Sequence, residues 1–180
     1  SAIPLKAFHQ GLNSLLPKDI AVLEATEAPP EFHARKSARA KTYEYRILNR
    51  RDRSPLVRHY AWWLAPRLDL RAMAGAAGAL VGEHDFTAFR ASGSDNLNPV
   101  RRVLAAAWRE EPGGWLSFTI TATGFLRGMV RSLVGTMAEV GQGKAPPARL
   151  AELLASPARH LAGPTAPPQG LYLLEVFYGE

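Results

Sequence analysis

The sequence predicts an α+β fold in which an antiparallel sheet carries its helices on one face. From Thr42 onward the expected elements run strand, helix, strand, strand, helix, strand, which is the split βαβ, ferredoxin-like order. Residues 111–114, Glu-Pro-Gly-Gly, separate two strand-like segments and favour a hairpin between them. With 180 residues, 47% of them hydrophobic, the chain can bury a core as one domain or as two halves of one.

Two elements are expected ahead of this pattern. Pro4 to Leu16 has apolar residues at helical spacing and predicts a short helix. Ile20 to Ala25 is a short strand candidate, after which Pro29 and Pro30 interrupt the chain.

The first half of the pattern begins at Thr42 to Leu48, where alternating residues with two tyrosines on one side predict a strand. A basic loop over residues 49–59 and a short extended segment over residues 60–64 follow. Asp69 can cap a helix whose apolar residues recur at helical spacing until Gly82 ends it.

The second half begins with strand-like segments at Val103 to Glu110 and Trp115 to Thr121. Gly124 to Gly141 then has a strong helical period and predicts a helix, in which glycines 124, 128 and 135 are expected to be close-packing positions. The remaining elements, in order, are a short helix, a proline-rich connector and a final strand: 147–155, 156–169 and 171–178.

The helix expected over 124–141 carries two arginines beside a wide apolar stripe. Arg127 and Arg131 are spaced one turn apart, where like charges repel. A guanidinium on a largely buried helix requires an anion, because an unpaired buried charge costs several kcal/mol. The sequence therefore predicts that a carboxylate or a phosphate faces this helix.

The net charge of +6 is concentrated in one window. Residues 35–58 hold nine Lys and Arg against Glu44 and Asp52, whereas the rest of the chain holds thirteen basic and fourteen acidic residues. Clustered basic charge is typical of a site for a polyanion such as a nucleic acid. A solvated basic face that binds nothing is the alternative interpretation of the same charge.

The free face of the predicted sheet suggests a first functional hypothesis. RNA-binding modules of this topology stack bases on aromatic side chains of the open face. Tyr43 and Tyr45 alternate on the first strand, where such aromatics would serve. The alternative is that both tyrosines pack in the core or across the sheet, since strands favour tyrosine in any case.

Composition excludes several other classes of chemistry. The chain has no cysteine, so disulfides, thiolate zinc sites and cysteine nucleophiles are excluded. The five histidines have no metal-ligand spacing, and no phosphate-loop or dinucleotide glycine pattern is present. No apolar run approaches the length of a membrane span, and no signal peptide opens the chain, so a cytoplasmic location is expected.

Four separated segments carry a family resemblance. They read FHARKSA at 32–38 followed by YEY at 43–45, HDFTAFR at 84–90, FLRGMVRSLVGTMAEVG at 125–141, and GLYL at 170–173. In the same order, these segments resemble motifs of the tRNA pseudouridine synthase A family. The similarity runs over essentially the whole chain.

The resemblance implies an activity. Members of this family detach the uracil of a uridine from its ribose, rotate it and rejoin it through carbon 5. They act on uridines 38, 39 and 40 of the tRNA anticodon stem-loop, as homodimers and without a metal or organic cofactor. The target base must leave its stack, at a cost of a few kcal/mol.

The resemblance also implies roles for individual residues. Tyr43 matches the tyrosine that stacks on the target uridine, Arg131 the arginine that pairs with the catalytic aspartate, and Leu171 an apolar residue of the base pocket. Two segments match stretches that contact tRNA, and we add further basic residues as candidate contacts. The complete set of RNA-binding candidates is Phe32, His33, Ala34, Arg35, Lys36, Arg90, Gly93, Ser94, Asp95, Asn96, Leu97, Arg101 and Arg127.

One departure from the family concerns its nucleophile. The catalytic aspartate of the family lies in a GRTDxGVH element that this sequence does not contain, and none of the five aspartates here matches it. Asp85 is expected to cap or brace a loop instead. We therefore expect residues 1–30 to be the remnant of an amino-terminal half-domain and residues 31–180 to be the carboxy-terminal half of the catalytic domain. The chain alone is expected to be inactive.

A non-catalytic RNA-binding module of RRM-like topology is the alternative function. Arg131 discriminates between the two, because a stacking module has no need of an arginine on a buried helix. If Arg131 serves an aspartate that is missing here, it should form no tight pair with a native carboxylate such as Asp85. A structural domain whose basic face contacts nothing is the third possibility.

Overall fold

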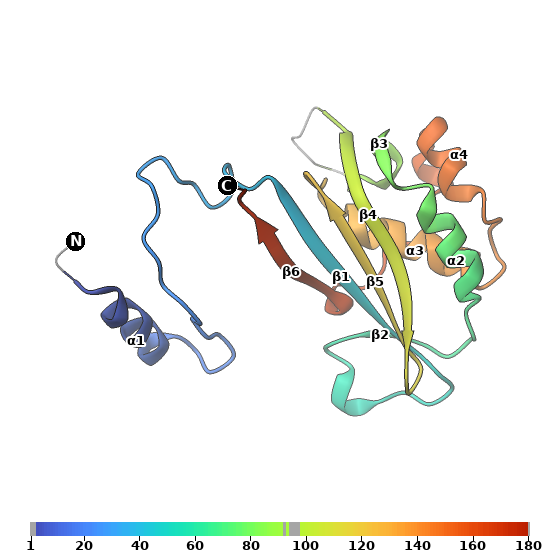
Figure 1. Ribbon diagram of the computed structural model, residues 1–180. Coiled ribbons are helices and arrows are strands. Elements are labelled where there is room, and N and C mark those ends of the chain that lie inside the picture. The colour runs from blue at the N-terminus through green and yellow to red at the C-terminus, as the bar shows by residue number, and fades with distance from the viewer. Residues whose placement is uncertain (1–2, 92, 94–97, 180) are drawn as a thin grey trace. The chain divides into compact units, whose positions relative to one another are not determined.

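The computed structural model describes residues 3–91, 93 and 98–179 (Figure 1). The chain divides into two compact units, residues 1–37 and residues 38–180. The first unit contains helix α1, Leu5–Leu15, which confirms the helix expected near the amino end.

The strand expected over Ile20 to Ala25 is wrong. Val22 pairs instead with a side chain of the helix end: its N–H donates to Asn13 Oδ1 and its C=O accepts from Asn13 Nδ2, both at 2.8 Å. A strand needs a neighbouring strand to pair with, and this segment satisfies its backbone groups through an asparagine instead.

The second unit is built on one sheet of six strands in the described part of the chain. The strands are β1 Ala40–Asn49, β2 Trp62–Leu64, β3 Gly82–Asp85, β4 Val100–Glu111, β5 Trp115–Ala122 and β6 Leu171–Phe177. The order is β2-β1-β5-β4-β3, and β6 pairs antiparallel with the first half of β1. The short β2 pairs parallel with the last three residues of β1.

The predicted split βαβ arrangement is confirmed by this order. Strands β6, β1, β5 and β4 lie side by side and all neighbouring pairs are antiparallel. The hairpin between β4 and β5 turns at residues 112–114, as expected from the Pro-Gly-Gly sequence. Strands β2 and β3 are additions at the two edges.

Three helices cover one side of the sheet: α2 Leu70–Gly78, α3 Met129–Gly141 and α4 Arg149–Ala155 (Figure 1). Asp69 caps α2 by accepting a hydrogen bond from Ala72 N at 3.0 Å, as predicted. Short 3₁₀ turns complete the unit: Pro55–Val57, Thr87–Phe89, Arg159–Leu161 and Pro168–Gly170.

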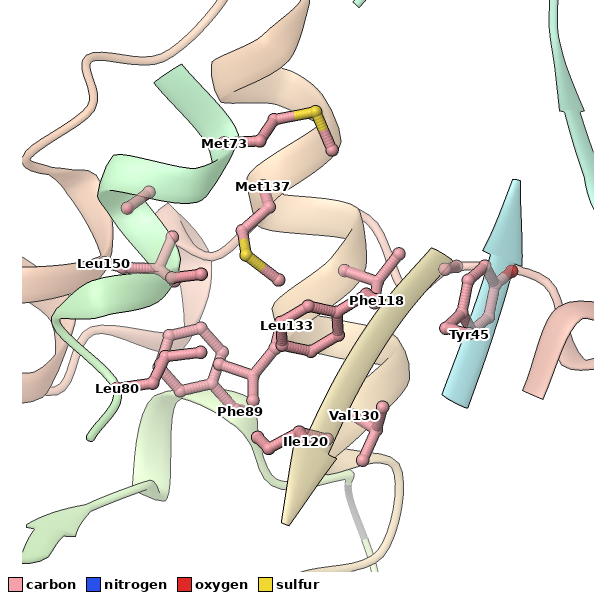
Figure 2. Packing of buried hydrophobic residues seen from close by; sticks show 14 of the residues in the cluster. Tyr45, Met73, Leu80, Phe89, Phe118, Ile120, Val130, Leu133, Met137 and Leu150 are labelled. Atoms are coloured by element: carbon pink, nitrogen blue, oxygen red, sulfur yellow. The ribbon is translucent and has the colours of Figure 1, made fainter. Parts of the chain in front are cut away.

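The core lies between the sheet and these helices. Ile120 and Phe118 of β5 face Leu133 and Met137 of α3, and none of the four is exposed to solvent (Figure 2). The opposite face of the sheet is polar where β1 and β5 pair; there the hydroxyls of Thr42 and Thr121 lie 2.8 Å apart.

Helix α3 begins later than its apolar period predicts. Gly128 has φ +76°, a left-handed conformation that glycine adopts without strain, and the helix starts only at Met129. Leu126 still packs in the core, but from the preceding loop. Arg127 therefore does not lie on the helix, and the expected repulsion between Arg127 and Arg131 one turn apart is wrong.

Strand β3 was not expected from the sequence. Its residues, Gly-Glu-His-Asp, show no alternation of apolar and polar side chains. It exists because it pairs with the first four residues of β4, which begins at Val100 rather than at Val103.

Candidate functional site

Arg131 lies in the first turn of α3 and is held by the connector that leads to β6. Its Nε donates to the carbonyl of Ala166 at 2.6 Å, and Ala166 N donates to the carbonyl of Arg131 at 3.0 Å. The side chain is half-buried. This double contact fixes the direction of the guanidinium before any ligand is present.

The connector packs closely against α3 because Gly135 has no side chain. A Cβ atom at Gly135 would lie 1.6 Å from the carbonyl oxygen of Pro164, so no other residue fits there without displacing the connector. At the next helix residue, Gly163 N donates to Thr136 Oγ1 at 3.0 Å, and this hydroxyl donates to Ser132 O at 2.9 Å. Close packing at Gly135, predicted from the sequence, is confirmed.

Tyr45 anchors the same connector at Pro167, the residue after Ala166. Its hydroxyl donates to Pro167 O at 2.6 Å, and the ring is completely buried. Burial raises the pKa of Tyr45 above its usual value of about 10, and the positive charge of Arg131 opposes part of that shift. Tyr45 is therefore a neutral hydrogen-bond donor in the electrostatic field of Arg131.

Tyr43 lies on the same face of β1 as Tyr45, two residues away. Its register partners are Ile120 on β5 and Leu173 on β6, and its ring meets Phe125 edge-on at 4.9 Å between centroids. Tyr43 is only half-buried, so part of the ring faces solvent. Leu171, opposite Tyr45 on β6, is likewise half-buried and packs against the core.

The two tyrosines thus face the helices, and the hypothesis that they stack bases on the open face of the sheet is wrong. Register decides this, because Tyr45 pairs with Phe118 and Tyr43 with Ile120, whose side chains lie in the core between sheet and helices. The alternative left open for them, packing on the core side, is confirmed for Tyr45.

Arg131 has no carboxylate partner among the described residues. The ion pairs found there are Arg46 with Glu44 and Arg149 with Glu152. Asp85 accepts a hydrogen bond from Thr87 N at 2.7 Å and so braces its own loop, as predicted. Arg131 is therefore a fixed, half-buried cation whose expected carboxylate is supplied by none of the described residues.

The sequence of this chain is similar to those of known proteins. A sequence model described as tRNA pseudouridine synthase matches residues 76–179, more than half of the chain. The tRNA pseudouridine synthase A of Myxococcus xanthus is 49% identical over 176 residues, which cover 98% of this chain and 66% of that protein. The enzyme of the same name from Geotalea uraniireducens is 48% identical and is covered to 72% of its length.

The chain belongs to the tRNA pseudouridine synthase family. Its resemblance to that family, read from the four motifs, is thereby confirmed. The chain spans about two thirds of the length of the Myxococcus relative. The range matched by the family model includes Arg131 and Leu171, and Tyr43 lies ahead of it.

The RNA-binding residues predicted from the sequence fall into three places. Phe32 to Lys36 lie in the first unit, where His33 organises a turn: its Nδ1 accepts from Arg35 N at 3.2 Å and from Lys36 N at 3.3 Å. Ser94 to Leu97 lie outside the described residues, whereas Gly93 is described and exposed.

The third group lies around the start of α3. Ala91 N, directly after Arg90, donates to Arg127 O at 2.9 Å, so these two predicted residues lie on adjoining loops. Arg127 is exposed and Arg90 is half-buried. Arg101 donates from Nη1 to Asn98 O at 2.9 Å, which turns its side chain back along β4.

Arg159 is a residue that sequence reasoning missed. From the connector, its Nη1 donates to Ala88 O at 3.3 Å and to Ser132 Oγ at 3.1 Å, and Nη2 donates to Thr165 Oγ1 at 3.4 Å. It ties the His84–Arg90 motif to the helix that carries Arg131. Its surroundings in the sequence, prolines and alanines, contain no signal of this role.

Two kinds of feature are absent from the described residues. These residues contain no group of three or more histidine, aspartate or glutamate side chains arranged to hold a metal ion. None of their helices has the length and apolar character needed to cross a bilayer.

Proposed function

We propose that residues 31–180 form the carboxy-terminal half of a pseudouridine synthase catalytic domain that converts uridines 38, 39 and 40 of the tRNA anticodon stem-loop. Residues 1–30 then belong to the amino-terminal half. The observation that carries this proposal is Arg131. It is a half-buried guanidinium, fixed by Ala166 O at 2.6 Å, and it has no carboxylate partner in the described part of the chain.

The reaction breaks the bond between uracil N1 and ribose C1′ and forms a bond between C5 and C1′. C5 loses its proton and N1 gains one, so the product is an isomer of the substrate. In the complete enzyme, Arg131 pairs with the carboxylate of the catalytic aspartate, which the amino-terminal half supplies, and keeps it ionised. Tyr43 stacks on the target base and Leu171 closes the pocket, and these contacts offset the cost of unstacking the base.

The charge distribution supports tRNA as the partner. The window from residue 35 to 58, with nine basic and two acidic residues, provides electrostatic attraction for a phosphate backbone. The same proposal includes contacts with RNA by the candidate residues Phe32 to Lys36, Arg90, Gly93 to Leu97, Arg101 and Arg127. It also includes a homodimeric assembly, a cytoplasmic location and catalysis without a cofactor.

Replacing Arg131 tests the proposal. The variant is made in a completed enzyme, in which the amino-terminal part of the Myxococcus xanthus relative, where we expect the aspartate segment, precedes this chain. Arg131→Ala should lower kcat for pseudouridine formation by about 10²–10³-fold, the effect of removing one preorganised charge partner. The affinity for tRNA should change by less than about threefold, because one of many cationic contacts is lost.

An equal loss of turnover and of tRNA binding in Arg131→Ala would contradict this role and favour a non-catalytic RNA-binding module. Arg127→Ala is the matched control, because it removes the same charge from the exposed loop just before α3. It should weaken tRNA binding slightly and leave kcat unchanged.

A further inference from the structure

A second basic site lies at the opposite end of α3 from Arg131. There the end of β1, the segment before α2 and the last residue of α3 line an open cavity of about 830 Å³. Its lining includes Asn49, Arg50, Arg51, Arg67, Arg71 and Gly141. Arg131 and Gly141 are ten helical residues apart, or about 15 Å along the axis, so the cavity is separate from the surroundings of Arg131.

The frame of this cavity is held by hydrogen bonds. Asn49 Nδ2 donates to Leu64 O at 2.8 Å and to Pro66 O at 2.7 Å, and Asn49 Oδ1 accepts from Leu68 N at 3.0 Å. Asp69 N then donates to Gly141 O at 2.8 Å and ties the segment to α3. The backbone that carries the arginines is therefore preorganised.

The cations in the cavity outnumber the anions and are not neutralised. Arg50, Arg51, Arg67 and Arg71 face two carboxylates, Asp69 and Glu110. Neither carboxylate forms an ion pair within the described ranges, and Asp69 is engaged in capping α2.

Most of these guanidiniums also lack a hydrogen-bond acceptor. Arg50 uses Nε to donate to Asp52 O at 2.9 Å. The side chains of Arg51, Arg67 and Arg71 make no hydrogen bond to the part of the chain that the structure describes, and all three are exposed. Their donor groups are available to a ligand.

We propose that this arginine cavity binds phosphate groups of the RNA backbone, as a contact on the tRNA away from the target uridine. Guanidinium forks match phosphate oxygens in pairs, and several arginines around one cavity fit a ligand with more than one phosphate. The choice of RNA as the source of the phosphates rests on the proposed function. Because the cavity lies at the far end of α3, its phosphates belong to a different part of the tRNA from the base held near Arg131.

The test compares two double variants of this 180-residue chain in binding to unmodified tRNA over a series of salt concentrations. Arg67→Gln with Arg71→Gln removes two free cations from the cavity, both outside the basic window 35–58. Lys18→Gln with Arg109→Gln is the matched control, since it removes the same charge from two exposed positions that do not line the cavity.

The cavity pair should weaken tRNA binding on the order of tenfold at low salt and reduce the slope of log K against log salt by about 2, roughly one per lost phosphate contact. The control pair should change the affinity by less than about twofold. Arg67→Lys with Arg71→Lys should restore most of the affinity, which excludes a folding defect as the cause. Equal effects of the cavity pair and the control pair would overturn the proposal.

Turnover separates this inference from the proposed function. In the completed enzyme, the cavity pair should raise KM for tRNA and leave kcat at saturating tRNA unchanged. If the completed enzyme formed no pseudouridine, the proposed function would fail, while the salt-dependent difference between the two pairs would still decide whether the cavity binds RNA. A loss of kcat with unchanged tRNA affinity would count against the cavity as a binding site.

Discussion

Tyr43 and Tyr45 lie two positions apart on β1, yet their surroundings give them different tasks. Tyr45 is completely buried and its hydroxyl donates a hydrogen bond to Pro167 O. Tyr43 is half-buried and its ring contacts Phe125 edge-on. The first supports the connector that holds Arg131. The second has ring surface left for a ligand, which is what a stacking residue requires.

Substitutions of Tyr43 test the stacking role at this scale. In the completed enzyme, Tyr43→Phe keeps the ring and its edge-on contact with Phe125, so kcat/KM should stay within about threefold of the parent. Tyr43→Ala should lower kcat/KM by about 10- to 100-fold, because base–aromatic stacking contributes about 1–3 kcal/mol. The rates are compared by tritium release from tRNA labelled at carbon 5 of uridine. Similar rates for both variants would show that the ring does not contact the base.

Tyr45→Phe tests the anchor of the connector. The variant leaves Pro167 O without its donor, which should lower the free energy of unfolding by about 1–3 kcal/mol in urea titrations of this chain. The effect should depend on pH in a definite direction. The pKa of Tyr45 is raised in the folded state. The contribution of the protonated tyrosine to the free energy of unfolding is therefore complete below about pH 10, the pKa of tyrosine in the unfolded chain, and is lost as pH rises above that value.

Above pH 10 the parent should therefore lose stability relative to Tyr45→Phe, at up to about 1.4 kcal/mol per pH unit. Unfolding measured at two pH values, one near 8 and one above 10, gives the comparison. A constant difference between parent and variant at both pH values would mean that Tyr45 ionises as freely when folded as when unfolded.

At the scale of elements, the contact between α3 and the connector decides where Arg131 points. Gly135→Ala places a methyl group 1.6 Å from Pro164 O, so the connector must move. We expect a loss of about 1–3 kcal/mol in the free energy of unfolding, the usual cost of overpacking. Gly75→Ala in the middle of α2 is the control, because a Cβ atom there meets nothing within 4 Å.

Gly75→Ala should raise stability by up to about 1 kcal/mol through helix propensity alone. Both variants are measured by urea unfolding of this chain. In the completed enzyme, Gly135→Ala should also lower kcat, because Arg131 loses the Ala166 carbonyl that orients it. Unchanged stability in Gly135→Ala would show that the connector does not need this close approach.

Short-range sequence patterns predicted most of the helices and strands, but they did not predict the contacts within the candidate site. The alternation around Tyr43, the cap at Asp69 and the hairpin at Pro112 are short-range signals, and β1, α2 and the β4–β5 pair follow them. The start of α3 was misjudged because a positive φ at Gly128 is a backbone choice that the apolar period cannot reveal.

Other features depend on contacts between distant residues and could not be predicted. Strand β3 exists through its pairing with β4, and the approach of Pro164 to Gly135 spans a proline-rich stretch without periodicity. The side of the sheet on which Tyr43 lies follows from the register with Ile120. The sequence predicted a functional role for Arg131, but it did not predict the hydrogen bond from Arg131 Nε to Ala166 O.

At the scale of the whole molecule, the question is whether this chain needs a carboxylate from outside its own sequence. We expect none of its aspartates to be the nucleophile, and Asp85 accepts a hydrogen bond from Thr87 N within its own loop. The relatives it matches are longer, since this chain covers 66% of one and 72% of another.

Tritium release from tRNA labelled at carbon 5 of uridine tests this most directly, with the 180-residue chain and the completed enzyme assayed side by side. We predict no release above background with the chain alone and steady release with the completed enzyme, which Arg131→Ala slows by about 10²–10³-fold. Release by the chain alone at a rate comparable to that of the completed enzyme would mean that one of its own carboxylates is the nucleophile, and it would contradict the role assigned to Arg131.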